Sequence, residues 1–407
     1  MVKHVINEKG YFARFDPGPK FFPKGHFGYL FSRKRKIFLK RVIIIGGGLA
    51  GLISSIELAR AGIPCQLIEK KRYPFHRVCG EYVSNEVVPF LDSVGLYPHH
   101  LKPPQINSFQ LSAIDGKSKI IALDQGGFGI SRFAFDAYLF EAAAALGVTF
   151  YQEEEVQNVV FRQNSFLVST GSREWECDVV IGAFGKRSKI DHRLNRPFVK
   201  ERSPYVGIKY HIRTLHPDDL ISLHNFPGGY CGISNIEEGK TTLCYLSHRR
   251  NLKEYRDVHE MERNVVYKNP LLREIFQNAE FVFPRPEVIN EISFATKSPV
   301  EEHILMAGDA AGMIAPLCGN GMAMAIHSGR LAASAVKKFI ENSVSREKME
   351  QDYTRAWQSN FKRRLWLGRQ VQKLFGNEIT SRVAVSLVMN VSPLAKAIIR
   401  NTHGQPF

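Results

Sequence analysis

The first clear pattern of apolar and polar positions lies over residues 41–69. Residues 41–45 form a β-branched apolar run, which is typical of a buried parallel strand. Apolar residues then recur at helical spacing over residues 49–61, and Gly62 supplies a helix stop. A second apolar strand covers residues 65–68 and runs into Glu69. This order of strand, helix and strand predicts a βαβ unit.

Beyond this unit the pattern changes from mixed α/β to β-rich and then to helical. Ser84 is a candidate N-cap for a helix that runs to about residue 94. The pattern predicts short strands within 106–130, a helix over 133–146, strands over 148–160, 165–169 and 178–182, short β segments with a charged helix (251–265) within 204–300, a strand over 303–307, a long helix to residue 340, and basic amphipathic helices over 346–407.

Composition describes an ordinary globular chain with a basic N-terminus. The 407 residues are 44% hydrophobic and 23% charged, enough for two or three domains' worth of core. The net charge is +16, and residues 1–41 carry +9 of it, from eleven Lys/Arg and two Asp/Glu. We interpret residues 1–39 as a solvated basic extension, with contact to anionic lipid as the alternative. We expect no nucleic-acid partner, because no DNA- or RNA-binding motif accompanies the charge.

Cysteine usage and hydropathy bound the location. None of the six cysteines forms a Cys-x-x-Cys pair, and no His cluster has ligand spacing, so we expect neither a metal nor a disulfide framework. The N-terminus lacks the apolar stretch of a secretory signal. Residues 42–56 are uncharged but too short and too glycine-rich for a membrane span. We expect a cytoplasmic protein, with peripheral membrane contact as an open alternative.

The glycine-rich segment over residues 46–51, Gly-Gly-Gly-Leu-Ala-Gly, follows the first strand and opens the first helix. Gly46 allows a tight turn, Gly48 lets a pyrophosphate approach the backbone, and Gly51 lets the helix pack on the strand. The helix N-terminus offers unpaired N–H groups to phosphates. Glu69, 18 residues after Gly51, is placed to accept hydrogen bonds from ribose hydroxyls. We refer to residues 46–51 as the phosphate turn.

A second turn follows the strand over residues 303–307 and reads Gly-Asp-Ala-Ala-Gly, with Pro316 and Gly-Asn-Gly-Met (319–322) after it. The small residues allow a flat ligand to approach the backbone, and Asp309 suits a ribityl hydroxyl. A helix from about Gly321 would direct N–H groups at the pyrimidine end of a flavin ring, where negative charge develops on reduction. The alternative is a purely structural turn with Asp309 as N-cap. We refer to residues 308–322 as the far turn.

Together the two turns resemble the FAD-dependent oxidoreductases related to geranylgeranyl reductase and p-hydroxybenzoate hydroxylase, over roughly residues 40–345. The far turn is more similar to the reductase branch, because the hydroxylases usually have His at the position of Gly312. The resemblance implies an α/β fold: a glutathione-reductase-like FAD-binding Rossmann domain with a β-rich substrate domain inserted and a helical C-terminal region. The implied boundaries are 1–39 for the extension, 40–203 and 301–345 for the two parts of the FAD-binding domain, 204–300 for the substrate domain and 346–407 for the helical region.

The resemblance also implies further cofactor contacts. The segment Arg-Val-Cys-Gly-Glu (77–81) corresponds to one that contacts the flavin, Arg132 meets the cofactor, and the backbone of Val156 contacts adenine. For Arg77 and Arg132 a surface cation is the alternative, and Cys79 is better explained as a small residue than as a catalytic thiol. The predicted FAD-binding residues are Gly46, Gly48, Ala50, Gly51, Glu69, Arg77, Cys79, Gly80, Arg132, Val156, Gly308, Asp309, Gly319, Gly321 and Met322; no catalytic residue or metal ligand is assigned.

Three segments depart from the family patterns. Residues 178–188 have the strand and turn of the hydroxylases' Asp-Gly segment but a shifted pattern, which puts direct NAD(P)H reduction in doubt. Residues 226–235 lack the Trp of the reductases' substrate segment. Flavin halogenases use a Trp-x-Trp-x-x-Pro segment, and Trp175, Trp357 and Trp366 are not so arranged. Halogenation is therefore disfavoured.

The implied activity is hydride transfer from reduced flavin to a carbon–carbon double bond of a polyprenyl or polyene substrate. Hydroxylation of an aromatic or polyene substrate and non-catalytic electron transfer are the alternatives. The electron donor is either NAD(P)H or a reduced carrier.

Two features suggest a hydrophobic substrate. Six aromatic residues are expected to line the inner face of the 204–300 insertion, although aromatic residues at strand spacing also suit a core: Tyr205, Tyr210, Phe226, Tyr230, Tyr245 and Phe294. The C-terminal region adds the apolar run 383–389 and basic helices in which Arg363, Arg364, Arg369 and Lys373 alternate with Leu365, Leu367 and Phe375. These helices either present a solvated face or contact anionic lipid.

Overall fold

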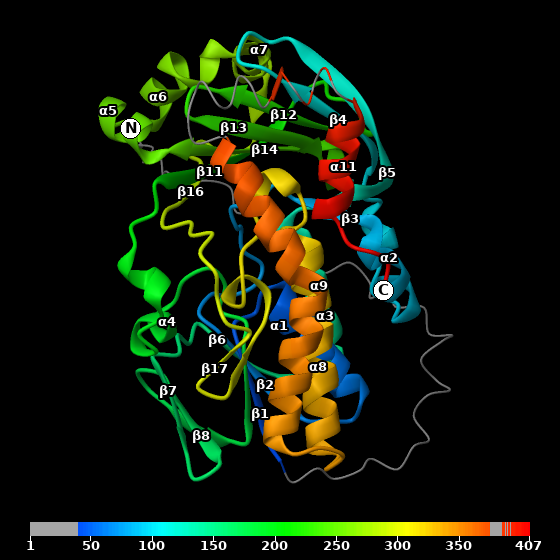
Figure 1. Ribbon diagram of the computed structural model, residues 1–407, viewed down its shortest axis with the longest axis vertical. Coiled ribbons are helices and arrows are strands. Elements are labelled where there is room, and N and C mark those ends of the chain that lie inside the picture. The colour runs from blue at the N-terminus through cyan, green and yellow to red at the C-terminus, as the bar shows by residue number, and fades with distance from the viewer. Residues whose placement is uncertain (1–39, 375–384, 387, 389, 391) are drawn as a thin grey trace, which may run out of the picture. The chain divides into compact units, whose positions relative to one another are not determined.

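A six-stranded, mostly parallel sheet organises the part of the chain that carries both glycine-rich turns (Figure 1). The computed structural model describes residues 40–374, 385, 386, 388, 390 and 392–407. All neighbouring strands are parallel except the first pair. In sheet order the strands are β17 (Val300–Glu301), β18 (Ile304–Met306), β10 (Val179–Gly182), β1 (Val42–Ile45), β2 (Cys65–Glu69) and β6 (Thr149–Gln152). The central strands β1 and β10 are completely buried, as parallel strands covered on both faces are.

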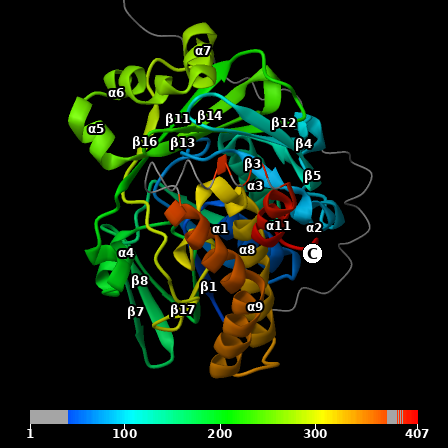
Figure 2. The ribbon, with the colours of Figure 1, turned by 45° about the horizontal axis from the view of Figure 1, so that its top comes forward.

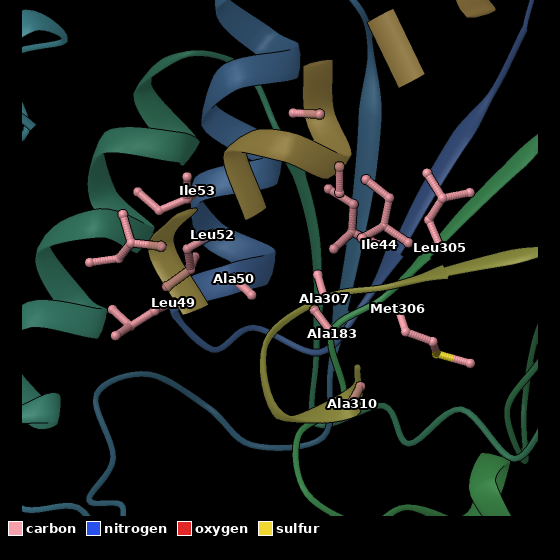
Figure 3. Packing of buried hydrophobic residues seen from close by; sticks show 14 of the residues in the cluster. Ile44, Leu49, Ala50, Leu52, Ile53, Ala183, Leu305, Met306, Ala307 and Ala310 are labelled. Carbon is pink, nitrogen blue, oxygen red and sulfur yellow. The ribbon is translucent and has the colours of Figure 1, made fainter. Parts of the chain in front are cut away.

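Helices from both ends of the chain pack together beside this sheet. Helix α1 (Leu49–Arg60) contacts α3 (Arg132–Ala145) and α8 (Gly321–Ile340), and α8 in turn contacts α9 (Arg346–Leu374). The contact is close where small residues meet, because a Cβ at Gly329 of α8 would lie 2.4 Å from the carbonyl oxygen of Ala50. Figure 3 shows how small the side chains are at this point: Ala50 begins α1 near the strand ends that carry Ala183 and Ala307.

A nine-stranded sheet, called here the roof sheet, forms the second layer (Figure 1). Its order is β15-β11-β14-β13-β12-β4-β5-β3, and β16 pairs with β11. The strands are β3 (Tyr82–Ser84), β4 (Gln105–Ser112), β5 (Ser118–Gly129), β11 (Tyr205–Arg213), β12 (Leu220–Phe226), β13 (Gly229–Asn235), β14 (Thr241–His248), β15 (Glu280–Phe281) and β16 (Glu287–Ile289). The pair β4–β12 is parallel, whereas the other pairs in this sheet are antiparallel.

One face of the roof sheet has its own apolar core. Side chains of β11, β12, β13 and β14 pack there against α6 (Val258–Asn264) and α7 (Pro270–Asn278), with α5 (Arg249–Tyr255) following β14. Tyr210 and Tyr245 belong to this core, and both hydroxyls donate to Glu262 of α6, at 2.9 and 2.6 Å. We call this side the outer face of the roof sheet, because the opposite face borders the cavity described below.

Smaller elements complete the described chain. They are the three-stranded sheet of β7 (Asn158–Arg162), β8 (Ser165–Ser169) and β9 (Glu174–Cys177), and the helices α2 (Val88–Ser93), α4 (Lys189–Arg193) and α11 (Ser392–Thr402). Helix α11 contacts both β5 and α9, and it lies beside them in both ribbon views (Figures 1 and 2). Among the helices of the described residues, none combines the length and the apolarity needed to cross a bilayer.

Most sequence predictions agree with these elements. The βαβ unit, the helix beginning at Gly321 and the α/β fold class with a β-rich layer and C-terminal helices are confirmed. The predicted helix over 251–265 is wrong: it is two helices, α5 and α6. Arg256 between them adopts a left-handed φ of +59°, and Asp257 caps α6 by accepting a hydrogen bond from the Glu260 N–H at 2.9 Å.

The roof sheet extends beyond the predicted substrate domain. The roof sheet is not confined to residues 204–300, because β3, β4 and β5 come from residues 82–129, within the segment assigned to the FAD-binding domain. Strand β4 joins it by pairing with β12 along Ser108–Ser112. The extension over residues 1–39, most of the apolar run 383–389, and Phe375 lie outside the described residues.

Candidate functional site

A cavity of about 770 Å³ lies between the carboxyl ends of the parallel strands and the inner face of the roof sheet. Ile45, Ala183 and Ala307 border it where β1, β10 and β18 end. Leu223 and Leu246 border it from β12 and β14. The cavity therefore has a floor built by the two glycine-rich turns and a chamber, our term for the portion lined by the roof sheet and the C-terminal helices.

The phosphate turn is shaped by glycines for which any side chain would be too large. Gly46 has φ +101°, and a Cβ there would lie 2.4 Å from the Ala183 carbonyl oxygen. A Cβ at Gly51 would lie 2.0 Å from the Gly46 carbonyl oxygen. Gly48 borders the cavity and is the N-cap of α1, where no side chain caps the helix. The free N–H groups of the first turn thus form an anion site at the cavity wall.

Glu69 supports this turn from beneath. Its side chain is 4% exposed, accepts hydrogen bonds from the Gly47 N–H at 2.7 Å and the Lys71 N–H at 3.0 Å, and lies 3.4 Å from the Arg77 guanidinium. The Tyr73 hydroxyl donates to the Gly47 carbonyl oxygen. Glu69 also borders the cavity, as a ribose-binding acid requires. Its role in holding the turn itself was not part of the prediction from sequence.

The far turn presents a second helix N-terminus to the same cavity. Gly308 (φ +61°) and Gly319 (φ +63°) take left-handed conformations, and α8 begins at Gly321 without a side-chain cap. Asp309 borders the cavity, and burial raises the pKa of its carboxyl, opposed by the cations Lys297, Arg132 and Lys186. Lys297 donates a hydrogen bond to the Asp309 carbonyl oxygen at 2.8 Å, which ties the turn to the loop before β17.

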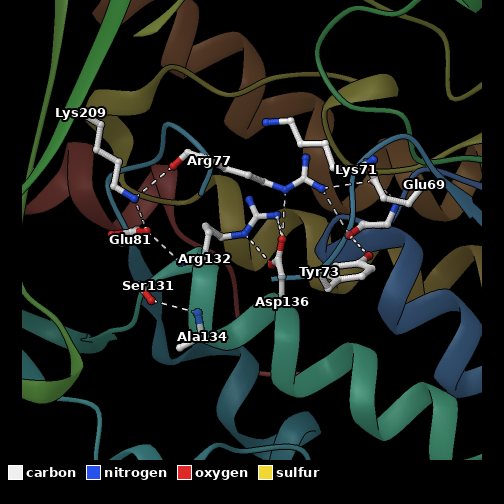
Figure 4. A network of polar contacts seen from close by, with 11 residues as sticks. Glu69, Lys71, Tyr73, Arg77, Glu81, Ser131, Arg132, Ala134, Asp136 and Lys209 are labelled. Carbon is white, nitrogen blue, oxygen red and sulfur yellow. Dashed lines mark hydrogen bonds and ion pairs between the residues drawn. The ribbon is translucent and has the colours of Figure 1, made fainter. Parts of the chain in front are cut away.

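A chain of buried ion pairs runs from the phosphate turn to α3 (Figure 4). Arg77 connects Glu69 to Asp136, whose carboxylate is 3.1 Å from the Arg77 Nε. Arg132 grips the same carboxylate with its Nε and Nη2, both at 2.7 Å. Arg132 and Arg77 border the cavity as predicted, but both guanidiniums are already paired. They therefore position the floor rather than offering unpaired charge to a phosphate.

The same chain continues from α3 to the roof sheet through Glu81, which is completely buried. The Glu81 carboxylate accepts from the Arg132 N–H at 2.8 Å, from the Lys209 ammonium and from His211 Nε2 at 2.6 Å. Burial raises the pKa of Glu81, but Lys209 and His211 more than offset this and bring it to about 2. Glu81 is thus a carboxylate that joins the roof sheet to the cofactor-binding floor.

Lys209 and His211 were missed in the sequence, although a signal was present. Along β11 the apolar side chains Val206, Ile208, Tyr210 and Ile212 face the outer core. The polar residues alternate with them, on the face toward the cavity, and each is only 2% exposed. A lysine and a histidine two residues apart on an otherwise apolar strand indicate buried charges that need a partner.

The predicted cofactor-binding residues come together at this cavity. Fourteen of the fifteen border it, and Gly51 instead packs under the phosphate turn. Cys79 borders the cavity, and burial raises the pKa of its thiol, so the side chain keeps its proton. This state suits the interpretation of Cys79 as a small neutral residue beside the cofactor.

The six aromatic residues expected on the inner face are divided between the two faces of the roof sheet. Tyr230 borders the chamber, and its hydroxyl is 3.2 Å from Gln372. Tyr245 borders it as well, although its hydroxyl is directed to the outer core. Tyr210 and Phe226 do not border it, because both belong to the outer core. Tyr205 and Phe294 contact each other and pack against the inner-face cluster that contains Tyr230, without lining the cavity themselves. The expectation of an aromatic inner face is therefore wrong for Tyr210 and Phe226, and the chamber lining is mainly aliphatic, with Leu111, Ile221, Leu223, Leu246, Ile289 and Ile292 among its residues.

The C-terminal region also borders the chamber, which the sequence did not suggest. Val371 of α9, Ile398 and Ile399 of α11, and His403 are lining residues. The His403 Nδ1 lies 2.9 Å from the Ile399 carbonyl oxygen, and burial lowers the pKa of His403. The helices beyond residue 346 thus build a wall of the cavity in addition to covering the domain.

Buried Glu86 fixes the end of this wall. Its carboxylate accepts from Asn320, the N-cap residue of α8, at 3.0 Å, from Arg364 of α9 at 2.9 Å, and from the Gly404 N–H. Phe407 stacks on His327 of α8, with ring centroids 3.7 Å apart. One carboxylate therefore connects the cofactor-binding helix α8 with the last residues of the chain.

Comparisons with known proteins agree with this arrangement. Residues 40–356 match the family described as FAD binding domain. The chain is 27% identical over 335 residues to the digeranylgeranylglycerophospholipid reductase of Methanosarcina acetivorans, covering 78% of this chain and 80% of that protein. It is 22% identical over 354 residues to the tryptophan 2-halogenase of Chondromyces crocatus, covering 79% of this chain and 66% of the halogenase, about two thirds of its length. A geranylgeranyl bacteriochlorophyll reductase-like protein of Thermoplasma acidophilum has the same fold, with a TM-score of 0.71 at 19% identity over 89% of this chain and 96% of that one.

The described residues fit FAD, which is the cofactor. The phosphate turn and the far turn each direct an uncapped helix N-terminus into one cavity, as a pyrophosphate and a flavin require. A Cβ at Gly48 would meet only the Arg132 Nη2, at 3.5 Å, so the space above the turn is open. The Gly46–Gly51 turn and Glu69 would hold the adenylate half, and the far turn would hold the flavin half.

Proposed function

The chain belongs to the FAD binding domain family, and we propose that this FAD-dependent oxidoreductase reduces carbon–carbon double bonds of a polyprenyl or polyene lipid. The observation that carries the proposal is the aliphatic chamber that continues the cofactor cavity. Reduced FAD supplies a hydride there. The reductase relatives support this substrate class by their names. Because halogenase relatives are also similar to the chain, experiment has to distinguish reduction from halogenation.

The chamber suits a long apolar chain. Leu111, Leu223 and Leu246 from three roof strands line it together with Ile398 and Ile399 from α11. Burying apolar substrate against such walls contributes about 25 cal/mol per Å² of surface removed from water. The same walls exclude water, so the double bond to be reduced would lie against the floor of the cavity in a dry environment.

A proton must follow the hydride to complete the reduction. Cys79 borders the cavity beside the floor and keeps a proton on Sγ, because burial raises the pKa of its thiol. The Glu81 N–H approaches the same sulfur at 3.4 Å and orients it. A thiol whose pKa is raised releases its proton less readily, so Cys79 is a neutral neighbour of the cofactor site, and we assign no residue as the proton donor.

Tryptophan positions argue against a halogenase of the Trp-x-Trp-x-x-Pro type. Trp175 is on β9, where it stacks edge-on against Tyr151, and Trp357 is in the core against Phe361. Trp366 is 55% exposed on α9. None of the three borders the cavity.

The test is an anaerobic half-reaction. The holoprotein is reduced with dithionite, NADH or NADPH in separate samples, and a geranylgeranyl lipid is then added. We expect the visible absorbance of oxidised flavin to return and the lipid to gain two hydrogens per double bond by mass spectrometry. Leu223→Trp, which fills the chamber, should retain FAD but abolish this reoxidation, whereas Ile120→Trp, at a 60% exposed position, should react normally.

Other outcomes would replace the proposal. Flavin that reoxidises only with oxygen, together with a hydroxylated product, would make the protein a monooxygenase. Halide-dependent product formation would place it with the halogenases. Reoxidation by artificial acceptors alone, with no lipid or aromatic product, would leave an electron-transfer flavoprotein.

A further inference from the structure

Helix α9 has two opposite faces with different surroundings. Trp357, Phe361 and Leu365 are buried against the rest of the molecule, and Val371 borders the chamber. Trp366 lies on the other face and is 55% exposed. Four large hydrophobic side chains are exposed in the described chain, and Trp366 is the aromatic one. A single exposed hydrophobic side chain is common on protein surfaces, so the meaning of Trp366 depends on the residues around it.

Cations surround this tryptophan. Gln358, Lys362, Arg363, Trp366 and Arg369 line one shallow hollow, which we call the α9 patch. Helical spacing places positions 358, 362, 366 and 369 on one side of the helix. After Asp352 helix α9 contains no acidic residue, although its first turns mix both signs. The charge of the helix therefore changes along its length, from balanced to purely basic.

Among the residues that the structure describes, the three cations of the α9 patch have no carboxylate partner. The ion pairs of α9 among the described residues are made by Lys348 and Arg355 with Asp352, by Glu350 with His303, and by Arg364 with Glu86. No ion pair reaches the cations of the patch within the described chain. Burial lowers the pKa of Arg369, and no neighbouring carboxylate opposes this. Unpaired cations around an exposed apolar side chain are complementary to a surface on which anionic groups lie beside apolar groups.

We propose that the α9 patch docks on an anionic lipid surface. Indole rings settle at the boundary between headgroups and acyl chains, and lysine and arginine beside them meet the phosphates. The position in the fold adds to this argument, because Trp366 and the chamber residue Val371 lie on opposite faces of one helix, less than two turns apart. Docking here would bring the chamber next to the bilayer. The inference concerns binding alone and does not depend on which reaction the flavin performs.

Vesicle flotation with the full-length holoprotein tests the proposal. We expect binding to vesicles containing phosphatidylglycerol, little binding to phosphatidylcholine alone, and weakening with salt. The triple variant Lys362→Glu, Arg363→Glu, Arg369→Glu should bind at least about a hundredfold more weakly, at roughly fivefold for each cation at a membrane surface. A matched triple, Arg250→Glu, Lys253→Glu, Arg273→Glu, makes the same charge change at exposed positions of α5 and α7 and should bind as the wild type does.

The basic residues 1–39 could bind vesicles by themselves, so a local readout is needed as well. The fluorescence of Trp366 is obtained as the difference between the wild type and Trp366→Phe. It should be quenched by brominated lipid and shifted to shorter wavelength on anionic vesicles. Leu215→Ser, which removes a fully exposed apolar side chain elsewhere, should leave vesicle binding unchanged.

Several other outcomes would contradict lipid docking by the α9 patch. Vesicle binding without quenching of Trp366, or equal losses from both triple variants, would assign membrane contact to other basic segments and overturn the proposal. Dimers in sedimentation that dissociate with Trp366→Ser would show that a second copy of the chain covers the patch. Absence of binding to any vesicle would also overturn it, whether or not the flavin reduces lipids.

Discussion

The floor and the chamber of the cavity are specified by different kinds of interaction. The floor is built mainly from backbone groups. Gly46 and Gly51 approach other backbone atoms so closely that no Cβ fits, and the N-termini of α1 and α8 have no side-chain cap. In the chamber, aliphatic side chains contributed by distant strands and by the C-terminal helices make the wall. We therefore expect substitutions at Gly46 and Gly51 to disrupt the floor, and substitutions of chamber side chains to leave the cofactor site intact.

The greatest effect is expected at the floor, from Gly51→Ala. The added Cβ would lie 2.0 Å from the Gly46 carbonyl oxygen, so the phosphate turn cannot close. We expect the purified variant to lose FAD, measured by absorbance and by mass spectrometry of the released cofactor. Gly232→Ala in the chamber, where the nearest atom is 3.7 Å away, should retain it. Equal FAD content in both variants would contradict the distinction between floor and chamber.

The second largest effect is expected from Lys209→Met, which removes the ion pair with Glu81 that connects the floor to the roof sheet. This variant leaves the buried Glu81 carboxylate without its ammonium partner, and breaking such a pair lowers the free energy of unfolding by about 3–5 kcal/mol. Arg213→Met removes an exposed pair with Glu280 at the edge of the roof sheet and should lower it by about 1 kcal/mol at most. Urea denaturation measures both, and similar losses would show that the Glu81 pair is not special.

At low pH the difference in free energy of unfolding between the wild type and Lys209→Met should become smaller. The pKa of Glu81 is about 2 in the folded protein against 4.5 for a free carboxyl, so its stabilisation is complete above pH 4.5 and is lost as pH falls toward 2. The shift corresponds to about 3 kcal/mol. The stability gap between the wild type and Lys209→Met should therefore narrow over this range. A gap that stays constant from pH 6 to 3 would rule out the charge of Glu81 as its source.

Asp309→Ala should have a moderate effect confined to the flavin. A hydrogen bond from a ligand to a charged group contributes about 1.5–3 kcal/mol, hence roughly a tenfold to hundredfold weaker FAD affinity. Asp92→Ala, at a half-exposed position paired with His99, should leave FAD binding unchanged. Titration of apoprotein with FAD distinguishes them. If both variants bind FAD alike, the far turn has only a structural role.

The smallest effect is expected on the outer face of the roof sheet, from Tyr210→Phe. Loss of its hydrogen bond to Glu262 should lower stability by about 1 kcal/mol, with FAD affinity and lipid-driven flavin reoxidation unchanged. Leu223→Trp should show the opposite behaviour, with stability retained and reoxidation lost. A change of turnover in Tyr210→Phe would mean that the outer core affects the chamber.

Sequence reasoning succeeded where structure is local. The phosphate turn, its helix and Glu69 lie within about 25 residues, and each glycine has a steric reason that can be read from spacing. The helix break at Arg256 was also local, and the Asp257-x-x-Glu260 spacing was a capping signal that could have revealed it.

The chamber could not be predicted in the same way. Alternation along a strand defines two faces but does not say which one meets the cavity, so Tyr210 and Phe226 were placed on the wrong side. The lining residues Ile398 and His403 come from a segment whose position depends on Glu86, more than 300 residues earlier in the chain. Such contacts depend on tertiary pairing, which short-range patterns do not record.

The parallel pair β4–β12 has a consequence for how such proteins could exchange parts. Ser108 lies beside Leu220 in this pair, so a stretch of more than 100 residues must be closed before the roof sheet is complete. Closing so long a stretch favours slow folding. A fragment of residues 204–300 would leave β12 with an open edge that is prone to aggregation. Recombination between relatives to transplant a substrate specificity would therefore have to carry the β4–β5 hairpin along with the insertion, as two exchanged segments rather than one.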